Sequence, residues 1–380
     1  MSSQVFACAA RSVEGQTPNT QHPPRAPTPM TSLPLLAMVI TSGLPNTHLV
    51  AMEPNAMFPS KGQEIVKVYR DVKSGIPFRE MIASWNVEPA KSAALKVEVR
   101  AHGDGFDSKW YTMGQWALED NTAPRESVKG QNDENGTVDT DTLILKKDGK
   151  SIDVQVTLKT IGDGPTPNLK LLTFSFANGE KQAPAAAEPS PAWGKTIDVP
   201  QRAQNNYPNG GVLCSATSMS MILWHYANQL GKPEMNKDVP EVEAHVWDKV
   251  YHGAGNWPFN TAYAGSFPGM RSYVARFGSI HDLEKWIESG YPVICSVSFD
   301  MLRGLPLSPT ESGHLVVLVG FTKDGDPVIN DPAFKNQVRR NYKRSDFEKA
   351  WLYSQRTVYL VYPEDASIPK DTDGLWYTPH

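Results

Sequence analysis

A segment rich in proline and alanine, Glu180–Ala192, divides this 380-residue chain into two parts with different hydrophobic patterns. Its apolar residues follow no period, which is typical of a semi-rigid linker. The linker therefore predicts two folded modules, and the chain is long enough to give each a core. We assign the chain to a leader (1–60), a first module (61–178), a linker (179–196), a second module (197–363) and a C-terminal tail (364–380).

The first module alternates apolar and polar residues, as half-buried strands do. Leu95–Arg100 and Asp153–Leu158 show this pattern most clearly. Asn-Gly and Asp-Gly pairs between these runs supply the chemistry of tight hairpin turns. The module is therefore predicted to be an antiparallel β-sandwich. Its large aromatic residues are expected to pack in the core, although a sugar or protein ligand is the alternative; they are Trp85, Trp110, Tyr111 and Trp116.

The second module begins with a helical pattern that starts at Cys214, and strand-like apolar runs follow. A glycine- and aromatic-rich loop is expected over Tyr251–Phe267, and the pair Ser345 and Glu348 is a capping-box signature for a last short helix. The clearest strands are Pro292–Ser298, Leu315–Val319 and Val358–Tyr362. A helix first and an antiparallel sheet afterwards predict the α+β class.

Charge and composition exclude several kinds of protein. The chain has 37 Lys and Arg against 41 Asp and Glu, so it lacks the basic surface that nucleic acids require. It has no run of 18 apolar residues, which excludes an integral membrane protein with spanning helices. Its three cysteines are Cys8, Cys214 and Cys295, without the C-x-x-C spacing of zinc sites. We therefore expect no metal; calcium at Asp139 and Asp141 is a less favoured alternative.

The leader contains one short apolar run, Leu33–Ile40, which has the length of a signal-peptide core and is too short to cross a bilayer. This run predicts an exported protein, either secreted or periplasmic. A leader that carries no targeting signal is the alternative.

Cys214 is placed at or just before the first turn of its helix. The helix dipole and the unpaired N–H groups at that end lower the pKa of a thiol. A lowered pKa favours nucleophilic chemistry, because the thiolate is the attacking species. The alternative is a small buried apolar residue, as most free cysteines are. Cys295, which lies in the middle of a predicted strand, is expected to be of that kind.

His314 stands at the start of an apolar strand, and Asp331 follows the next strand after a turn at Asp324–Gly325. Counted from that turn, the two residues are three or four positions out of register, and a bulge or strong twist would bring them together. A histidine that activates a cysteine needs a third group to orient its ring. The alternatives are a core histidine and an aspartate used in a turn before Pro332.

The order Cys214, His314, Asp331 is that of papain-like cysteine peptidases. Residues 197–363 resemble the bacteriocin-processing cysteine peptidases that cleave double-glycine leaders, and in particular the stand-alone bacterial proteins called peptidase C-thirty-nine-like. The resemblance rests on Gln204 and on the segments Leu213–Met221, Gly255–Ala262, Gly290–Ile294, Gly313–Val317 and Asn330–Pro332. The first module is similar to the sandwich that often precedes this domain, through Ser84–Asn86, Met113–Trp116 and Val138–Leu143.

The resemblance implies a papain-like fold and a role for each residue. Cys214 would be the nucleophile, His314 the general base and acid, and Asp331 the group that orients the histidine. The Gln204 amide and the Cys214 backbone N–H would bind the oxyanion, with Gln201 as a rival because Gln204 precedes Cys214 by ten positions. No metal or organic cofactor is implied.

The expected function is therefore hydrolysis of a peptide or other amide bond in a peptide or protein substrate through a thioester acyl-enzyme. Trp257, Phe259 and Tyr263 would line the substrate groove, with packing of the loop as the alternative. Two other functions remain open. The chain would be a binding protein if catalysis is vestigial, with a polysaccharide or protein held by the sandwich. It would be an acyltransferase or transglutaminase-like enzyme if an amine replaces water.

Overall fold

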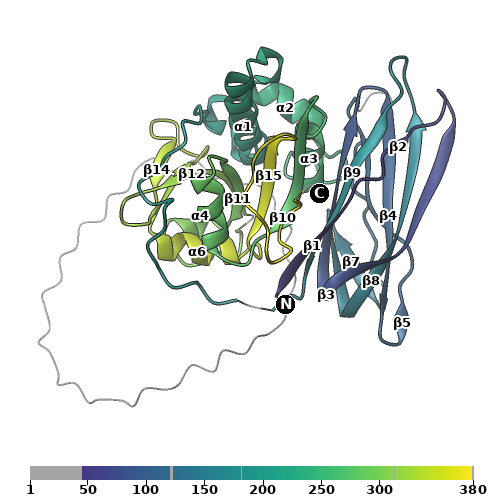
Figure 1. Ribbon diagram of the computed structural model, residues 1–380, viewed down its shortest axis with the longest axis horizontal. Coiled ribbons are helices and arrows are strands. Elements are labelled where there is room, and N and C mark those ends of the chain that lie inside the picture. The colour runs from purple at the N-terminus through teal and green to yellow at the C-terminus, as the bar shows by residue number, and fades with distance from the viewer. Residues whose placement is uncertain (1–44, 120–122, 181, 312, 379–380) are drawn as a thin grey trace, which may run out of the picture.

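The computed structural model describes residues 45–119, 123–180, 182–311 and 313–378. Two bodies lie side by side (Figure 1): a β domain and, after the linker, a domain of helices around a second sheet. The predicted order, an antiparallel β domain followed by an α+β domain, is confirmed. The apolar run at 33–40 lies outside the described residues.

The β domain is a single antiparallel sheet that encloses one apolar core. Its longest strand is β3 (Glu64–Glu88). It pairs with β8 (Thr142–Thr160) from Glu64 to Ile82 and with β9 (Asn168–Ala177) from Glu80 to Glu88. Register shifts surround Asp71 and Gly75, whose φ angles are +53° and +77°, so the strand bends there. The strands are β1 (Thr47–Met52), β2 (Ala56–Met57), β3 (Glu64–Glu88), β4 (Ala93–Gly103), β5 (Phe106–Asp107), β6 (Tyr111–Ala117), β7 (Gly136–Asp139), β8 (Thr142–Thr160) and β9 (Asn168–Ala177).

The sheet extends into the segment that the sequence assigned to the leader. Strand β1 pairs with β9 along its whole length, from Thr47 opposite Ala177 to Met52 opposite Leu172. Leu49 is buried in the same apolar cluster as Leu171, which explains why this part of the chain is ordered into a strand. The β domain therefore begins near residue 47.

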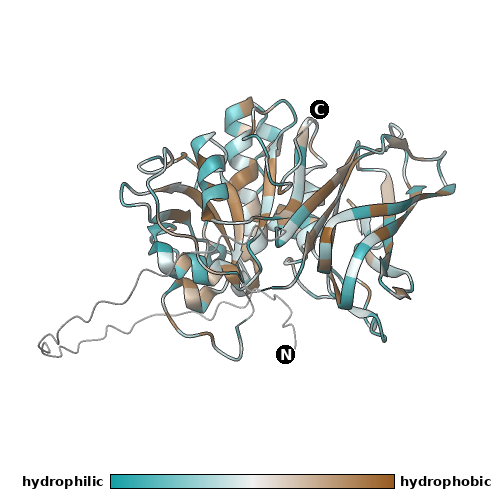
Figure 2. Ribbon diagram, turned by 60° about the horizontal axis from the view of Figure 1, so that its bottom comes forward, coloured by the Kyte–Doolittle hydropathy of each residue, from teal (hydrophilic) through white to brown (hydrophobic). Residues whose placement is uncertain are grey.

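The second domain is a six-stranded antiparallel sheet with helices on both faces. In Figure 2 its central strands are largely hydrophobic, whereas the outer turns are hydrophilic. The strands run in the order β10-β15-β11-β12-β13-β14. They are β10 (Met270–Arg276), β11 (Val293–Val297), β12 (His314–Phe321), β13 (Pro327–Asn330), β14 (Arg339–Asn341) and β15 (Thr357–Pro363). The helices are α1 (Cys214–Leu230), α2 (Val239–Val246), α3 (Trp257–Ala264), α4 (Ile280–Glu288), α5 (Phe299–Leu302) and α6 (Arg344–Leu352), with short 3-10 turns at Gln204–Asn206, Gly210–Val212 and Pro233–Met235.

Strand β12 is apolar after its first residue because both of its faces are buried. Leu315, Val317 and Val319 pack in the cluster that contains α1, α2 and part of α3, whereas Val316 and Leu318 pack in the cluster that contains α4, α5 and α6. A strand that is covered on both faces has no polar side. The strand predicted at 315–319 is confirmed, because it lies within β12.

Two local predictions need correction. The segment expected to be a loop contains helix α3, since Asn256 caps it by accepting a 3.2 Å hydrogen bond from the Phe259 N–H and Pro258 occupies its first turn. The expected capping box at Ser345 and Glu348 does not form: α6 begins at Arg344, and Glu348 instead accepts a hydrogen bond from the Ala185 N–H.

The linker and the tail both pack against the second domain. Gly194 donates to the Phe321 carbonyl, and Trp193 and Thr196 form isolated bridges to the end of β12. In the tail, Leu375 and Trp376 are buried in the cluster of α4 and α6. These contacts hold both segments on the surface of the domain.

Helix α3 joins the two domains. Its Phe259 and Ala262 lie in the core of the β domain, whereas its Tyr263 and Ala264 lie in the core of the second domain. Phe259 packs edge-on against Trp85, with ring centroids 6.3 Å apart. A helix shared by two cores fixes the domains to one another.

Strand β10 is the edge of the second sheet, and side chains of β3 satisfy its backbone groups. Asn86 accepts a 3.1 Å hydrogen bond from the Ser272 N–H and donates one of 2.7 Å to the Ser272 carbonyl. Ser84 accepts from the Val274 N–H at 3.0 Å. The Ser84–Asn86 segment thus takes the place of a neighbouring strand.

Candidate functional site

Helix α1 begins at Cys214, which is buried. The residue before it, Leu213, offers no side chain that could cap the helix. The Cys214 sulfur accepts a 3.4 Å hydrogen bond from the Leu315 N–H on β12. The sulfur therefore lies where the positive end of the helix dipole meets the start of this strand.

His314 and Asp331 are brought together by a bulge in the pairing of β12 with β13. The register shifts between Leu318 and Gly320, and Val317 then pairs with Asn330. Continuing that register puts Asp331 opposite Val316, on the face of the sheet that His314 shares. The His314 Nε2–H donates a 2.8 Å hydrogen bond to Asp331 Oδ1.

The Asp331 carboxylate is completely buried and has three donors. Besides His314, the Tyr342 hydroxyl donates to Oδ2 at 2.6 Å and the Ala333 N–H donates to Oδ1 at 2.9 Å. Burial by itself raises the pKa of Asp331, but the charge of His314 and these hydrogen bonds outweigh it and hold the pKa below its usual range. The group is therefore an anion at neutral pH.

A second carboxylate holds the segment that leads to His314. Glu311 accepts hydrogen bonds from the N–H groups of Phe299, Asp300 and Gly313. Gly313 has a φ of +78°, a conformation that glycine adopts without strain. The Phe299 ring packs edge-on against the His314 ring at 4.8 Å, so the imidazole is held from two sides.

The two candidate glutamines differ in their surroundings. Gln204 is fully buried, its Nε2 donates to the Gly210 carbonyl at 2.8 Å, and its N–H donates to the Pro332 carbonyl, one residue after Asp331. Gln201 is exposed and accepts from the Arg339 N–H at 3.0 Å. The backbone of Gln204 is thus tied to the site.

The three aromatic residues expected along a substrate groove are all buried on α3, and Trp257 lines a pocket between the two domains. Phe259 fills the core of the β domain. Tyr263 stacks on His245 in the other core, with ring centroids 5.0 Å apart. Phe259 and Tyr263 therefore pack in the two cores and do not line a groove, which was the alternative stated for them.

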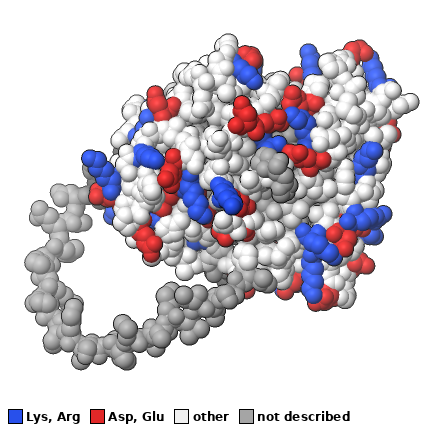
Figure 3. Space-filling view, viewed as in Figure 1, with Lys and Arg blue, Asp and Glu red and all other residues white. Residues whose placement is uncertain are grey.

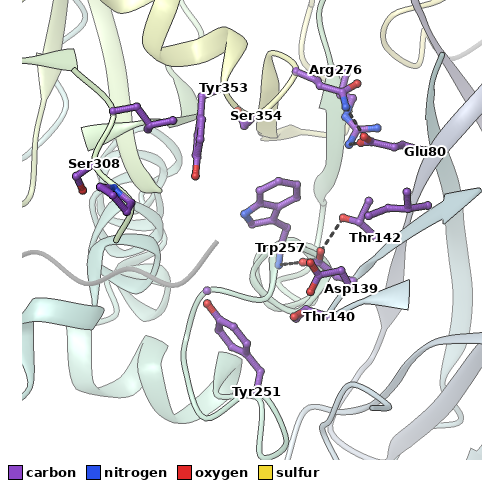
Figure 4. Close-up of a pocket in the computed structure, with 16 residues that line it drawn as sticks. Glu80, Asp139, Thr140, Thr142, Tyr251, Trp257, Arg276, Ser308, Tyr353 and Ser354 are labelled. Carbon is purple, nitrogen blue, oxygen red and sulfur yellow. Dashed lines mark hydrogen bonds and ion pairs between the residues drawn. The ribbon is translucent and has the colours of Figure 1, made fainter. Parts of the chain in front are cut away.

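A pocket of about 490 Å³ opens between the two domains. Figure 4 shows Trp257 at its centre, with Tyr251 and Tyr353 on either side of the indole. The β domain contributes Glu80, Asp139, Thr140, Asp141, Thr142 and Ile144; the second domain contributes Tyr251, Gly255, Trp257, Arg276, Leu307, Ser308, Pro309, Tyr353, Ser354 and Gln355.

Two structural links run from the walls of the pocket toward Cys214 and His314. Ser215, the residue after Cys214, shares a 3.0 Å hydrogen bond with the Tyr359 hydroxyl, and the charge of Asp141 acts on the pKa of that same tyrosine. On the other side, the lining segment 307–309 leads directly to Glu311 and His314. Among the described residues, neither Cys214 nor His314 lines the pocket itself.

No group of three or more His, Cys, Asp or Glu residues within the described ranges could hold a metal ion. In the same part of the chain, no helix is long and apolar enough to cross a membrane. The face in Figure 3 carries acidic and basic residues intermixed. The electrostatics of that face favour no polyanionic partner.

Comparison with known families agrees with this architecture. A model of the Peptidase C39-like family matches residues 196–359, and a model of the Peptidase C39 N-terminal domain matches residues 69–177. The chain belongs to the Peptidase C39-like family. Membership suggests a cysteine peptidase and implies a peptide substrate. No curated protein matches the chain.

Three residues of this peptidase-family site were missed by the sequence reasoning. Tyr342 and Glu311 act through hydrogen bonds to Asp331 and to the Gly313 N–H, and no local pattern marks either residue. Ser215, the residue after Cys214, bonds to Tyr359 on β15. Such contacts depend on the sheet topology, which a sequence motif does not encode.

Proposed function

We propose that this chain is a cysteine peptidase in which Cys214 attacks the carbonyl carbon of a peptide bond. One observation carries the proposal: His314 is bonded through Nε2 to a buried carboxylate, while the next residue, Leu315, donates its N–H to the Cys214 sulfur. The Nε2 bond leaves Nδ1 of the same ring to receive the thiol proton.

The reaction follows from these positions. Cys214 is disulfide-bonded in the structure, so the reaction starts from the reduced protein. There His314 Nδ1 takes the proton of the Cys214 thiol, and the thiolate adds to the substrate carbonyl to give a tetrahedral oxyanion. The oxyanion collapses, the C–N bond breaks, and His314 returns the proton to the leaving amine. A water molecule, deprotonated by His314, then hydrolyses the thioester and regenerates the thiol. Asp331 stabilises the imidazolium that forms at each stage.

The oxyanion is assigned to the backbone N–H of Cys214 and to the Gln204 side chain. The first N–H groups of a helix point along its axis toward negative charge, as α1 does at Cys214. Burial of Gln204 and its backbone bond to Pro332 favour this residue over the exposed Gln201. Donors fixed in advance in this way stabilise the transition state most effectively.

The proposal is tested by the rate at which iodoacetamide alkylates Cys214 between pH 5 and 9. The full chain carries Cys8→Ser and Cys295→Ala, so that Cys214 is its one cysteine, and it is reduced beforehand because alkylation requires a thiol. We expect fast alkylation well below the pKa of about 8.5 of an ordinary thiol. His314→Ala should abolish this low-pH reactivity.

His281→Ala is the matched control, because His281 belongs to α4 and bonds to Glu284, away from Cys214. A profile centred near pH 8.5 that ignores His314 would overturn the assignment of the nucleophile. A casein digest analysed by mass spectrometry then tests hydrolysis, with Cys214→Ala as the inactive variant. Products that join an added amine, in place of hydrolysis, would favour acyl transfer instead.

A further inference from the structure

The pocket between the domains carries an imbalance of charge. Arg276, the one lysine or arginine among the described lining residues, is nearly fully buried and pairs with Glu80 at 2.8 Å, and the other Glu80 oxygen accepts from Gln355. The Arg276 charge is therefore paired with Glu80, and the charge of Asp141 also acts on it. Asp139 and Asp141 remain, and within the described ranges neither forms an ion pair with a lysine or arginine.

These two carboxyl groups are held in place by the turn between β7 and β8. Asp141 accepts a 2.8 Å hydrogen bond from the Trp257 N–H and a 3.0 Å bond from the Thr142 hydroxyl. Thr140, between the two aspartates, has a φ of +56°, which is rare for a β-branched residue. Burial raises the pKa of both carboxyls, that of Asp141 to about 7. Both would ionise more readily beside a cation.

The remaining walls of the pocket suit a long, flexible side chain with a charged end. Tyr251, Trp257 and Tyr353 present aromatic rings (Figure 4), and Leu307, which is 47 % exposed, also lines the pocket. Aromatic faces bind both methylene groups and cations. In addition, Nη1 of Arg276 is buried without a hydrogen-bond acceptor among the described residues, so it can donate to a carbonyl group of a ligand.

We propose that this pocket binds a lysine or arginine side chain of the peptide substrate, with the cationic end beside Asp139 and Asp141 and a backbone carbonyl at Arg276. The inference rests on the proposed peptidase function and adds the substrate class. The lining segment 307–309 precedes Glu311 and His314 in the chain, and through it an occupant would direct cleavage to bonds near a basic residue.

The test compares two ligands with side chains of equal length, Nα-acetyl-lysine methylamide and the Nα-acetyl methylamide of 2-aminoheptanoic acid, in which a methyl group replaces the ammonium group. Binding is measured by calorimetry with the full-length Cys214→Ala variant. The lysine compound should bind about ten-fold more tightly, as expected for a charge-assisted hydrogen bond. Its advantage should grow from pH 6 to pH 8 as Asp141 ionises. The pKa of Asp141 is raised by the charges of Asp139 and Asp248 and lowered by hydrogen bonds from the Trp257 N–H and the Thr142 hydroxyl. The charge of Asp141 also acts on Arg276.

Asp139→Asn should remove the preference for lysine. Asp163→Asn, which removes the same charge from an exposed turn of the β domain, should keep it. Equal binding of the two ligands would overturn the proposal, and so would an Asp139→Asn variant that folds and still prefers lysine. The ligand comparison in the otherwise unaltered pocket does not depend on any Asp139 variant folding. The calorimetry measures binding without hydrolysis. A negative result would therefore overturn the pocket proposal, whereas a negative alkylation test would overturn the proposed nucleophile.

Discussion

The Tyr342 hydroxyl donates a 2.6 Å hydrogen bond to the Asp331 oxygen that His314 does not use. Tyr342 stands next to Asn341, the last residue of β14. Burial and the neighbouring Asp331 charge raise the pKa of Tyr342 well above its usual range, so it remains a donor at every relevant pH. The strand pair β13–β14 therefore supports the orientation of His314 from behind.

Tyr342→Phe should raise the pKa of Asp331, because the carboxylate loses one of its donors. The low-pKa Asp331 contributes stability above pH 4 that is lost as the pH falls through its folded pKa, and the variant should lose this contribution at a higher pH. Thermal melts at pH 3 to 7 measure this shift. We expect a loss of about 1–3 kcal/mol at pH 7, and Tyr69→Phe, in the β domain, should match the wild type.

Gln204→Ala should lower kcat by about 100-fold with little change in KM, as removal of an oxyanion donor does. Gln201→Ala is the matched control and should leave kcat within about two-fold, since its side chain bonds to the Arg339 N–H at an exposed position. Steady-state kinetics on a casein-derived peptide decides between them. Equal effects, or an effect of Gln204→Ala on melting temperature alone, would remove Gln204 from the oxyanion site.

Asn86→Ala should destabilise the chain by about 2–4 kcal/mol, because both backbone groups of Ser272 lose a buried partner. Urea unfolding monitored by tryptophan fluorescence measures the loss. Asn178→Ala serves as the control, since its half-buried side chain bonds to Asn46 away from β10. If both variants unfold at the same urea concentration, the Asn86 contacts add no stability between the domains.

Asp141→Asn should stabilise the protein most at pH 8, and the effect should shrink as the pH falls toward 4. The folded pKa of Asp141 is about 7, above the ordinary 3.8, so this group's contribution to wild-type stability falls as the pH rises between those values. The difference corresponds to at most about 4 kcal/mol at pH 8. Melting temperatures across this pH range should diverge between variant and wild type. A constant offset would argue against a raised pKa.

The order of Cys214, His314 and Asp331 could be read from the sequence because each stands at a recognisable element boundary. The helix start at Cys214 and the strand start at His314 follow from local periodicity. The turn spacing left either a bulge or a strong twist to bring His314 and Asp331 together, and the structure has a bulge. Strand β1 was missed because six residues beside a proline-rich leader carry little periodic signal.

Contacts between the domains could not be predicted in the same way. Asn86 and Ser272 are 186 positions apart, and their meeting depends on how two separate sheets approach each other. The pocket has the same origin, because Asp139 and Asp141 belong to one domain and Tyr353 to the other. The Ser84–Asn86 and Val138–Leu143 segments contributed to the family resemblance, but their contacts with the second domain could not be predicted from the sequence.

The side chains of Ser84 and Asn86 give β10 a partner that is not a strand. Without the β domain, the peptidase domain would present an open row of N–H and C=O groups along β10, a template for pairing with another chain. The accessory domain therefore protects its neighbour from self-association. A fragment that starts at residue 197 should form edge-to-edge assemblies, whereas the intact chain should stay dispersed.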